Sequence, residues 1–431
     1  MKKVIIFILT FSVILTVVLL LGWRYPEAEN VQDAEQKREQ QQELQQNQTK
    51  NKKQIHKDTE TAAMVIPAEL STEVTRESLA VTELTVRYGG REQMEISFTP
   101  LEADVETYYL MRKEMCEDKE SQWTVCQEIP GEIKEELFCL TDAADGDGYV
   151  QYKYRVDVKP ADEDMYEGIP GTEVLASNVL ICIDPGHFVG KNQAVGDDSF
   201  GYAEGDFTLR IGLALRDILK EKYGIDSVMT RDTPSIILAG YTDGVLDGGH
   251  ISMRGAYAGE MGCDLFLSLH TNANQDNVNG HPTWQQPIGI TKTIILANQL
   301  ACGNEDMIRV GNGIGTNVSV INFELGISGN KGFDLGIVNE VREWSDAYND
   351  SLDTAGSIRC RLGSNGDYYG VLKGAANAGV PGMIVEHGMH TVPEFRKQAM
   401  ESDLYKQLAE ADAYGIAYGF GFVSEIQMRG E

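Results

Sequence analysis

The sequence predicts an α/β domain that follows a small β-rich module and an apolar N-terminal segment. Three observations predict the α/β domain. An apolar strand pattern ends in Pro-Gly-His at 185–187, an amphipathic helix pattern begins at Glu204, and later apolar strands end at His270 and Glu386. Strands that alternate with helices are typical of α/β sheets. The 431 residues are enough for about two or three domains.

The N-terminal segment is the first element in chain order. Residues 4–21 (VIIFILTFSVILTVVLLL) carry no charge, and Lys2, Lys3 and Trp23 flank them. A helix of this length reaches roughly 30 Å, the thickness of a hydrocarbon core. The lysines should stay cytoplasmic, so residues 1–26 are predicted to form a single-pass anchor in the cell membrane, with the rest of the chain on the outer side. A cleaved signal peptide is the alternative, and it also exports the protein.

Residues 27–70 are predicted to be a polar linker. They are dominated by Gln, Glu and Lys, as in EQKREQQQELQQNQTKNKKQ. Such a segment buries too little apolar surface to offset the entropy lost on ordering. A short coiled coil is the alternative, but no apolar heptad supports it.

Residues 71–177 show short alternating runs separated by turn signals, which predict a β-sandwich. The run YVQYKYRVDV at 149–158 alternates polar and apolar residues, which is strand periodicity. Together with Trp123, the Tyr-x-Tyr-x-Val strand makes the module resemble a fibronectin type III domain. We expect it to act as a spacer or to contact a protein partner. Further predicted strands lie at 84–88, 94–98, 108–113 and 121–125.

The charge and cysteine content exclude several classes of protein. The net charge is −29, whereas a nucleic-acid-binding protein needs a basic face to displace counterions. Seven cysteines are scattered without a CxxC pair, so a zinc ribbon or thioredoxin-like site is not indicated. Cys116 and Cys126 are a possible disulfide, and most of the other thiols are expected to be free and buried.

The α/β domain begins with the strand at 178–184 (NVLICID), which leads into His187. Open α/β sheets build their sites at the carboxyl ends of strands. Glu204 then opens a helix whose apolar residues recur at three- and four-residue steps, and Gly224 is its predicted stop. Further elements are predicted at 227–231 (strand), 252–262 (helix), 265–270 (strand) and 381–386 (strand).

Two histidines and two carboxylates therefore stand where they can converge. Two imidazoles and one carboxylate, with an open fourth position, are typical of catalytic zinc. The metal acidifies a water molecule, and a further carboxylate can take its proton. His187, Glu204 and His270 suit the metal, and Glu386 suits the base. These residues are far apart in the sequence, so their spacing alone does not identify a metal site. A histidine at a strand end is also often a hydrogen-bonded structural residue.

The motifs themselves carry a family resemblance. IDPGHFVG, the helix-opening Glu204, SLHTNA and VPGMIVEHG resemble the AmiC-like zinc-dependent N-acetylmuramoyl-L-alanine amidases (amidase 3 family), from about Val179 to Tyr418. The resemblance implies a mixed sheet of about six strands flanked by helices within residues 178–424, and one Zn2+ ion. It implies the zinc ligands His187, Glu204 and His270 and the catalytic Glu386, and hydrolysis of the bond between N-acetylmuramic acid and L-alanine in peptidoglycan.

Some features depart from the family pattern or extend it. After Glu386 this chain has His387 and His390 where many relatives have a Gly-Phe pair. Both are candidates for hydrogen bonding near the site, for substrate contact or for packing. Arg254, Asn272 and His387 are the candidate substrate contacts. Residues 274–366 are predicted to be an insertion that is either a lid over a substrate groove or a surface decoration.

Two other functions remain open from the sequence. One is an inactive wall-binding scaffold on the same fold, and the other is a zinc peptidase that acts on another amide. The amidase reading predicts peptidoglycan as partner, and the apolar segment predicts a membrane contact. The ligand types also admit manganese or iron.

Overall fold

The computed structural model describes residues 79–425, apart from 116–120, 134, 144–147, 162–167, 192–199, 246–247, 274–275, 279–280, 284–290, 292 and 327–357. The predicted membrane segment (1–26) and polar linker (27–70) lie outside the described residues. Among the helices that the structure describes, none is both long enough and apolar enough to cross a membrane.

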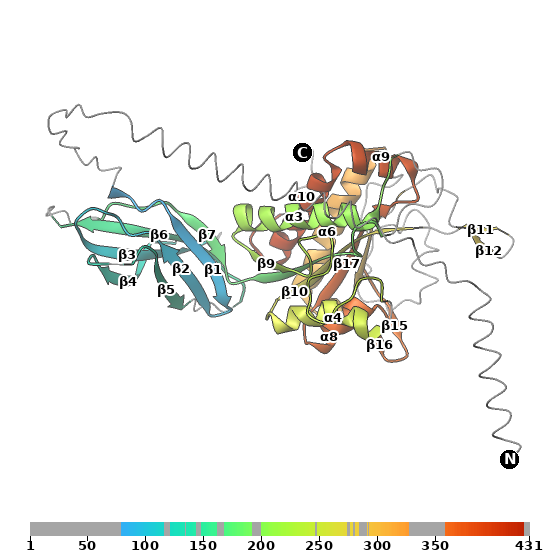
Figure 1. The fold of residues 1–431 in the computed structure, drawn as a ribbon, viewed down its shortest axis with the longest axis horizontal. Coiled ribbons are helices and arrows are strands. Elements are labelled where there is room, and N and C mark those ends of the chain that lie inside the picture. The colour runs from blue at the N-terminus through green and yellow to red at the C-terminus, as the bar shows by residue number, and fades with distance from the viewer. Residues whose placement is uncertain are drawn as a thin grey trace, which may run out of the picture. The chain divides into compact units, whose positions relative to one another are not determined.

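The N-terminal module consists of two antiparallel sheets (Figure 1). In β6 the side chains of Tyr152, Tyr154 and Val156 are fully buried, as the alternating sequence predicts. They join side chains of the other sheet, such as Phe98 and Ile96, in one buried cluster. One sheet has the order β1 (Leu84–Gly90), β2 (Gln93–Phe98), β5 (Phe138–Ala143), and the other β4 (Thr124–Pro130), β3 (Val105–Glu114), β6 (Gln151–Pro160), β7 (Val174–Ser177).

The second sheet is six-stranded and mixed, which confirms the predicted α/β class. Strands β9, β8, β10 and β17 run parallel, whereas β13 is antiparallel to β17 and carries β14 parallel to itself. The order across the sheet is β14 (Ile358–Cys360), β13 (Ile294–Ala297), β17 (Gly382–Met389), β10 (Leu265–Asn272), β8 (Leu180–Pro185) and β9 (Asp226–Met229).

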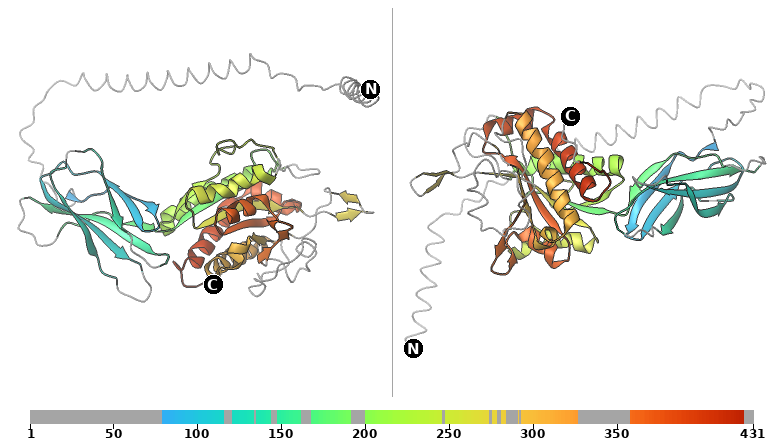
Figure 2. Two further views of the ribbon diagram at one scale, coloured as in Figure 1. Left: turned by 90° about the horizontal axis from the view of Figure 1, so that it is seen from below. Right: turned by 180° about the vertical axis from the view of Figure 1, so that it is seen from behind.

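Helices cover both faces of this sheet (Figures 1 and 2). Strands β8 and β17 are buried along their whole length, as central strands of α/β sheets are, and each begins with an apolar run before its polar residues. One face carries α3 (Glu204–Tyr223), α6 (Glu305–Glu324) and α10 (Leu404–Gly419), and the other α4 (Gly248–Glu260) and α8 (Gly370–Asn377). The remaining elements are α5 (Gln299–Cys302), α9 (Pro393–Glu401) and the hairpins β11 (Asp276–Val278), β12 (His281–Thr283) and β15 (Leu362–Gly363), β16 (Gly366–Asp367).

Helix α3 matches its prediction closely and sets one side of the site. Its apolar residues Phe207, Ile211 and Leu215 are buried. The helix ends at Gly224, whose φ of 66° is left-handed and whose N–H bonds to the carbonyl of Lys220. This is the usual way for glycine to end a helix. At the other end, Glu204 is the first helical residue.

The predicted insertion at 274–366 is in part a component of the core, which corrects that expectation. It supplies β13, α6 and β14, two of the six strands and a helix that packs against α10. The two helices approach closely, since a Cβ added to Gly415 would lie 2.3 Å from the backbone nitrogen of Ile314. The Gly-rich sequence of α6 is therefore a packing surface and not a loop.

Candidate metal and catalytic site

His187 is presented by a tight turn at the end of β8. The N–H of Gly186 donates to the carbonyl of Leu269 over 2.8 Å. A Cβ at Gly186 would lie 2.4 Å from that carbonyl oxygen and 2.6 Å from Nε2 of His270, so only glycine allows this approach. His187 itself has a φ of 59° and is the one described non-glycine residue with positive φ. The turn thus brings two histidines from neighbouring strands together.

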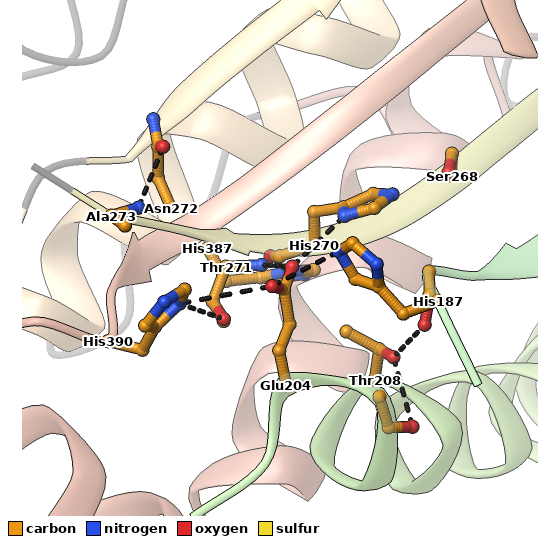
Figure 3. A network of polar contacts seen from close by, with 12 residues as sticks. His187, Glu204, Thr208, Ser268, His270, Thr271, Asn272, Ala273, His387 and His390 are labelled. Carbon is orange, nitrogen blue, oxygen red and sulfur yellow. Dashed lines mark hydrogen bonds and ion pairs between the residues drawn. The ribbon is translucent and has the colours of Figure 1, made fainter. Parts of the chain in front are cut away.

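The carboxylate of Glu204 contacts both histidines (Figure 3). Its Oε2 is 3.2 Å from Nε2 of His187, and its Oε1 is 3.0 Å from Nδ1 of His270. The backbone N–H of Thr271 also donates to Oε1, over 2.9 Å. One donor atom from each of the three predicted ligands lies within 4.8 Å of the others. The structure therefore brings together the set that the sequence predicted.

The protonation of this group suits a metal. Burial alone would raise the pKa of Glu204, but His187 and His270 hold that pKa well below the usual value. Burial lowers the pKa of His270 in spite of Glu204. An anionic carboxylate is the form that binds a cation. The donor set fits zinc.

Glu386 is the second buried acid of the site. It lies opposite His270 in the parallel pairing of β17 with β10 and is only 9% exposed. Its Oε2 is buried and has no hydrogen-bond partner among the described residues. Burial, with the charge of Glu204, raises the pKa of Glu386 well above its usual value. A carboxyl group whose pKa is raised in this way holds a proton more readily than an ordinary glutamate, which suits a group that accepts and returns a proton.

Two buried arginines support the turn that carries His187. Arg254, predicted as a substrate contact, instead donates to Oδ1 of Asp184 over 2.8 Å and to the carbonyl of Pro185 over 2.8 Å. Arg231 was not singled out from the sequence. It is fully buried and donates to the carbonyls of Pro185 and Gly186 over 2.9 and 3.0 Å.

Asp184 completes this support. Its side chain is fully buried and accepts hydrogen bonds from Thr230 and Ser268 as well as Arg254. Burial would raise the pKa of Asp184, but Arg254 and the two hydroxyls lower it overall. Asp184 is therefore an anion that anchors the end of β8.

Asn272 lies two residues beyond His270 on β10 (Figure 3). Its Oδ1 accepts a hydrogen bond from the N–H of Ala273 over 2.8 Å. Its Nδ2 is buried and has no partner among the described residues. Of the three predicted substrate contacts, Asn272 is the one that keeps an unused donor.

His387 is not placed for substrate contact, because it is fully buried. Its Nε2 lies 2.9 Å from Oδ2 of Asp412, and its Nδ1 lies 3.0 Å from the carbonyl oxygen of His270. Asp412 stands in the middle of α10 and carries no motif that would have identified it.

His390 lies on the other side of Glu204 (Figure 3). Its Nδ1 is 3.0 Å from the hydroxyl of Thr271 and 4.0 Å from Oε2 of Glu204. The ring stacks on Tyr202 with centroids 5.8 Å apart. It is thus a buried neighbour of the metal-binding group.

Comparisons with known proteins agree with this site. A family model described as N-acetylmuramoyl-L-alanine amidase (Amidase_3) matches residues 181–418. A search of curated proteins gave no match. Several solved structures are similar at low identity. An N-acetylmuramoyl-L-alanine amidase from Clostridium difficile 630 has 16% identity, with 55% of this chain and 94% of that chain covered and a TM-score of 0.36.

Two other solved structures show similar values. The catalytic domain of CwlV, an amidase from Bacillus (Paenibacillus) polymyxa var. colistinus, has 18% identity over 56% of this chain and 96% of that chain, with a TM-score of 0.34. The CwlD amidase from Clostridioides difficile, solved in complex with the GerS lipoprotein, has 14% identity over 57% of this chain and 100% of that chain, with a TM-score of 0.37.

Proposed function

Because the chain belongs to the N-acetylmuramoyl-L-alanine amidase family, we propose that it works with zinc held by His187, Glu204 and His270 and with Glu386 as general base. The enzyme is a peptidoglycan hydrolase that cleaves the amide between N-acetylmuramic acid and the L-alanine of the stem peptide. The observation that carries the mechanistic proposal is the grouping of three metal donors beside one buried carboxyl group with an unpartnered oxygen.

The donor set supports zinc in particular. Two imidazoles and one carboxylate leave a position open in a tetrahedral site, which is typical of catalytic zinc. When bound, zinc supplies Lewis acidity that polarises the amide carbonyl and makes a nearby water more acidic. Three donor atoms within 4.8 Å of one another suit binding to a single ion.

Glu386 performs the proton transfers in this proposal. It takes a proton as a water oxygen attacks the amide carbon, and it gives that proton to the leaving nitrogen as the C–N bond breaks. The products are the lactyl carboxylate of N-acetylmuramic acid and a stem peptide with a free L-alanine amino group. Burial raises the pKa of Glu386, which allows it to retain the proton between the two steps.

Neighbouring residues have defined roles in the same proposal. Asn272, whose Nδ2–H is buried and has no partner among the described residues, donates to an oxygen of the substrate once a side-chain rotation exposes it. Arg254 and Arg231 fix the carbonyls of the turn before His187, so they act on the substrate only through that histidine.

The rest of the chain places the enzyme. Residues 71–177 form a β-sandwich of fibronectin type III type, which the two antiparallel sheets over one core support, and this module acts as a spacer or contacts a protein partner. Residues 1–26 anchor the chain in the cell membrane, with the amidase domain (178–424) on the cell-wall side. The length of the apolar run and its preceding lysines support this orientation. Protease digestion of intact cells tests it, because only an external domain is accessible.

Mass spectrometry of digested muropeptides tests the function. The full chain, loaded with zinc or stripped by a chelator, is incubated with peptidoglycan. Zinc-dependent release of intact stem peptides that begin with L-alanine is the expected result, with the glycan strands unbroken. Glu386→Gln should be inactive, and the exposed Glu401→Gln should match the parent. Cleavage within the stem peptide would instead indicate a peptidase. Absence of any cleavage by the zinc-loaded parent would indicate a scaffold.

A further inference from the structure

A buried histidine–aspartate pair connects β17, the strand that carries Glu386, to helix α10. His387 follows Glu386 in β17, and Asp412 lies in α10. Both side chains are fully buried. Nε2 of His387 is 2.9 Å from Oδ2 of Asp412, and Nδ1 is 3.0 Å from the carbonyl oxygen of His270. The imidazole therefore joins three elements: β17, β10 and α10.

Each of the two contacts of the His387 ring is a hydrogen bond and therefore contains one proton. The carbonyl oxygen of His270 can only accept, so Nδ1 carries a proton. A second proton lies in the contact between Nε2 and the carboxyl group of Asp412, whichever of the two atoms holds it. The ring is thus fixed in orientation at both nitrogens.

The pair lies at an irregularity of the sheet. His270 is opposite Glu386, but the next registered pair is Asn272 with Met389. One residue of β10 therefore faces two residues of β17, His387 and Gly388. Such bulges next to sites re-aim side chains and interrupt the backbone ladder. The side-chain bond from His387 to the carbonyl of His270 ties the two strands together at this point.

We propose that His387 and Asp412 are positioning residues that hold Glu386 at a fixed distance from the metal ligand His270. The hydrogen bond from His387 ends on the carbonyl of His270, and His387 directly follows Glu386, which is paired with His270. Helix α10 also packs against α3, whose first residue is Glu204. One pair therefore links the base and two of the three metal ligands through rigid elements.

Stability alone does not explain the pair. Taking two charged groups out of water costs about as much as their attraction returns, and apolar residues of similar volume often serve a core as well. Asp412 also keeps one oxygen, Oδ1, without a partner among the described residues. A hydrogen-bonded ring, unlike an apolar side chain, fixes direction and distance, which is what a base beside a metal needs.

This inference rests on the proposed role of Glu386, and its test is the double variant His387→Leu/Asp412→Leu in the full chain. The variant should unfold at a temperature equal to or above that of the parent. Its kcat should nevertheless be about 10- to 100-fold lower, with KM within about twofold. Zinc affinity, measured by competition with a chelator, should be about 10- to 100-fold weaker.

Two single variants keep the test decisive if the double variant does not fold. The amide nitrogen of Asn occupies the place of Nδ1, so His387→Asn retains the bond to the carbonyl of His270. The amide nitrogen of Gln occupies the place of Nε2, so His387→Gln retains only the contact with Asp412. His387→Asn should keep at least about tenfold more kcat than His387→Gln, although each loses one contact.

The outcomes separate this inference from the proposed function. Parent-like kcat and zinc affinity in the double variant would overturn the positioning role, as would losses in His387→Asn and His387→Gln that simply follow their unfolding temperatures. An inactive zinc-loaded parent, or a fully active Glu386→Gln, would overturn the proposed mechanism instead. The parent and Glu386→Gln are therefore assayed in the same experiment.

Discussion

Glu386 and His270 are directly paired in adjacent parallel strands, β17 and β10. Paired residues of neighbouring strands project from the same face of a sheet. Glu386 and His270 are thus set side by side by backbone hydrogen bonding, and a slip of one residue would place them on opposite faces. The proposed roles of Glu386 and His270 therefore depend on the register of the sheet.

The raised pKa of Glu386 predicts that Glu386→Gln stabilises the metal-free protein at neutral pH. The folded pKa lies above the usual value of 4.5 because of burial and Glu204. The contribution of Glu386 to stability is therefore fully present below about pH 4.5 and is lost as the pH rises through the folded pKa. Gln does not titrate, so we expect a gain of about 0.5–2 kcal/mol at pH 8 and little difference at pH 4.

Thermal unfolding of the two metal-free proteins across this pH range measures the effect. Glu401→Gln, at an exposed position, serves as the control for a change of net charge. A constant difference between parent and Glu386→Gln at every pH would contradict the assignment.

Replacing Glu204 should separate metal binding from proton transfer. Glu204→Gln removes the anionic donor between His187 and His270, so zinc affinity should fall by at least about 100-fold. Glu386→Gln should keep one zinc per chain, since Glu386 lies outside the group of three donors. Metal analysis after dialysis distinguishes the two variants. Full zinc content in Glu204→Gln would exclude it as a ligand.

Gly186→Ala should disable the site without touching a polar group. The new Cβ would lie 2.4 Å from the carbonyl oxygen of Leu269 and against the ring of His270. We expect a loss of about 1–3 kcal/mol of stability and a fall in kcat of about 100-fold from displaced ligands. Gly248→Ala is the matched control, because nothing lies within 4 Å of a Cβ there. Unfolding temperature and turnover rate are measured together.

Arg254→Met should destabilise the protein strongly, because it leaves Asp184 buried with one fewer positive partner. Breaking a buried ion pair in this way costs about 3–5 kcal/mol. Arg216→Met removes an exposed pair with Asp217 and should cost about 0–1 kcal/mol. Denaturant unfolding compares the two. Equal losses would mean that Arg254 does not support the His187 turn.

Asn272→Ala should weaken catalysis by removing the unused donor near the metal-binding group. The loss of one hydrogen bond to substrate predicts kcat/KM about tenfold lower, while zinc content stays at the parent value. Asn377→Ala, at an exposed position of α8, is the control. Unchanged kinetics on muropeptides would remove Asn272 from the substrate contacts.

The places of His187, Glu204, His270 and Glu386 in the fold could be predicted because each stands at a boundary of a strong pattern, whereas their roles as metal donors and base stay predictions. The apolar strands before His187 and His270 and the helix after Glu204 are readable from periodicity alone, and the family motifs supplied their roles. Asp412 could not be predicted. It is one polar residue in an amphipathic helix, and its importance depends on packing against a strand 25 residues earlier.

The segment at 274–366 was misread for a physical reason. Strand β13 has four residues, and α6 is rich in Gly and Asn, so composition resembled that of a loop. The small residues are needed because α6 and α10 pack with their backbones close together at Gly313 and Gly415. In the N-terminal module, β5 and β7 were not predicted because β7 is only four residues long and β5 has no fully buried residue.

The left-handed conformation of His187 has a consequence for the thermodynamics of metal binding. A positive φ raises the conformational energy of a histidine. In the folded chain, the hydrogen bonds of Gly186, Arg231 and Arg254 already hold His187 in this conformation before any ion binds. Glu204 and His270 are likewise held by a helix start and a strand end. An arriving ion then restricts few additional torsions, so we expect the heat-capacity change on binding to be small. The affinity should depend on the chemistry of the donor atoms and on the release of hydration water. Metal sites that fold around their ion behave differently in both respects.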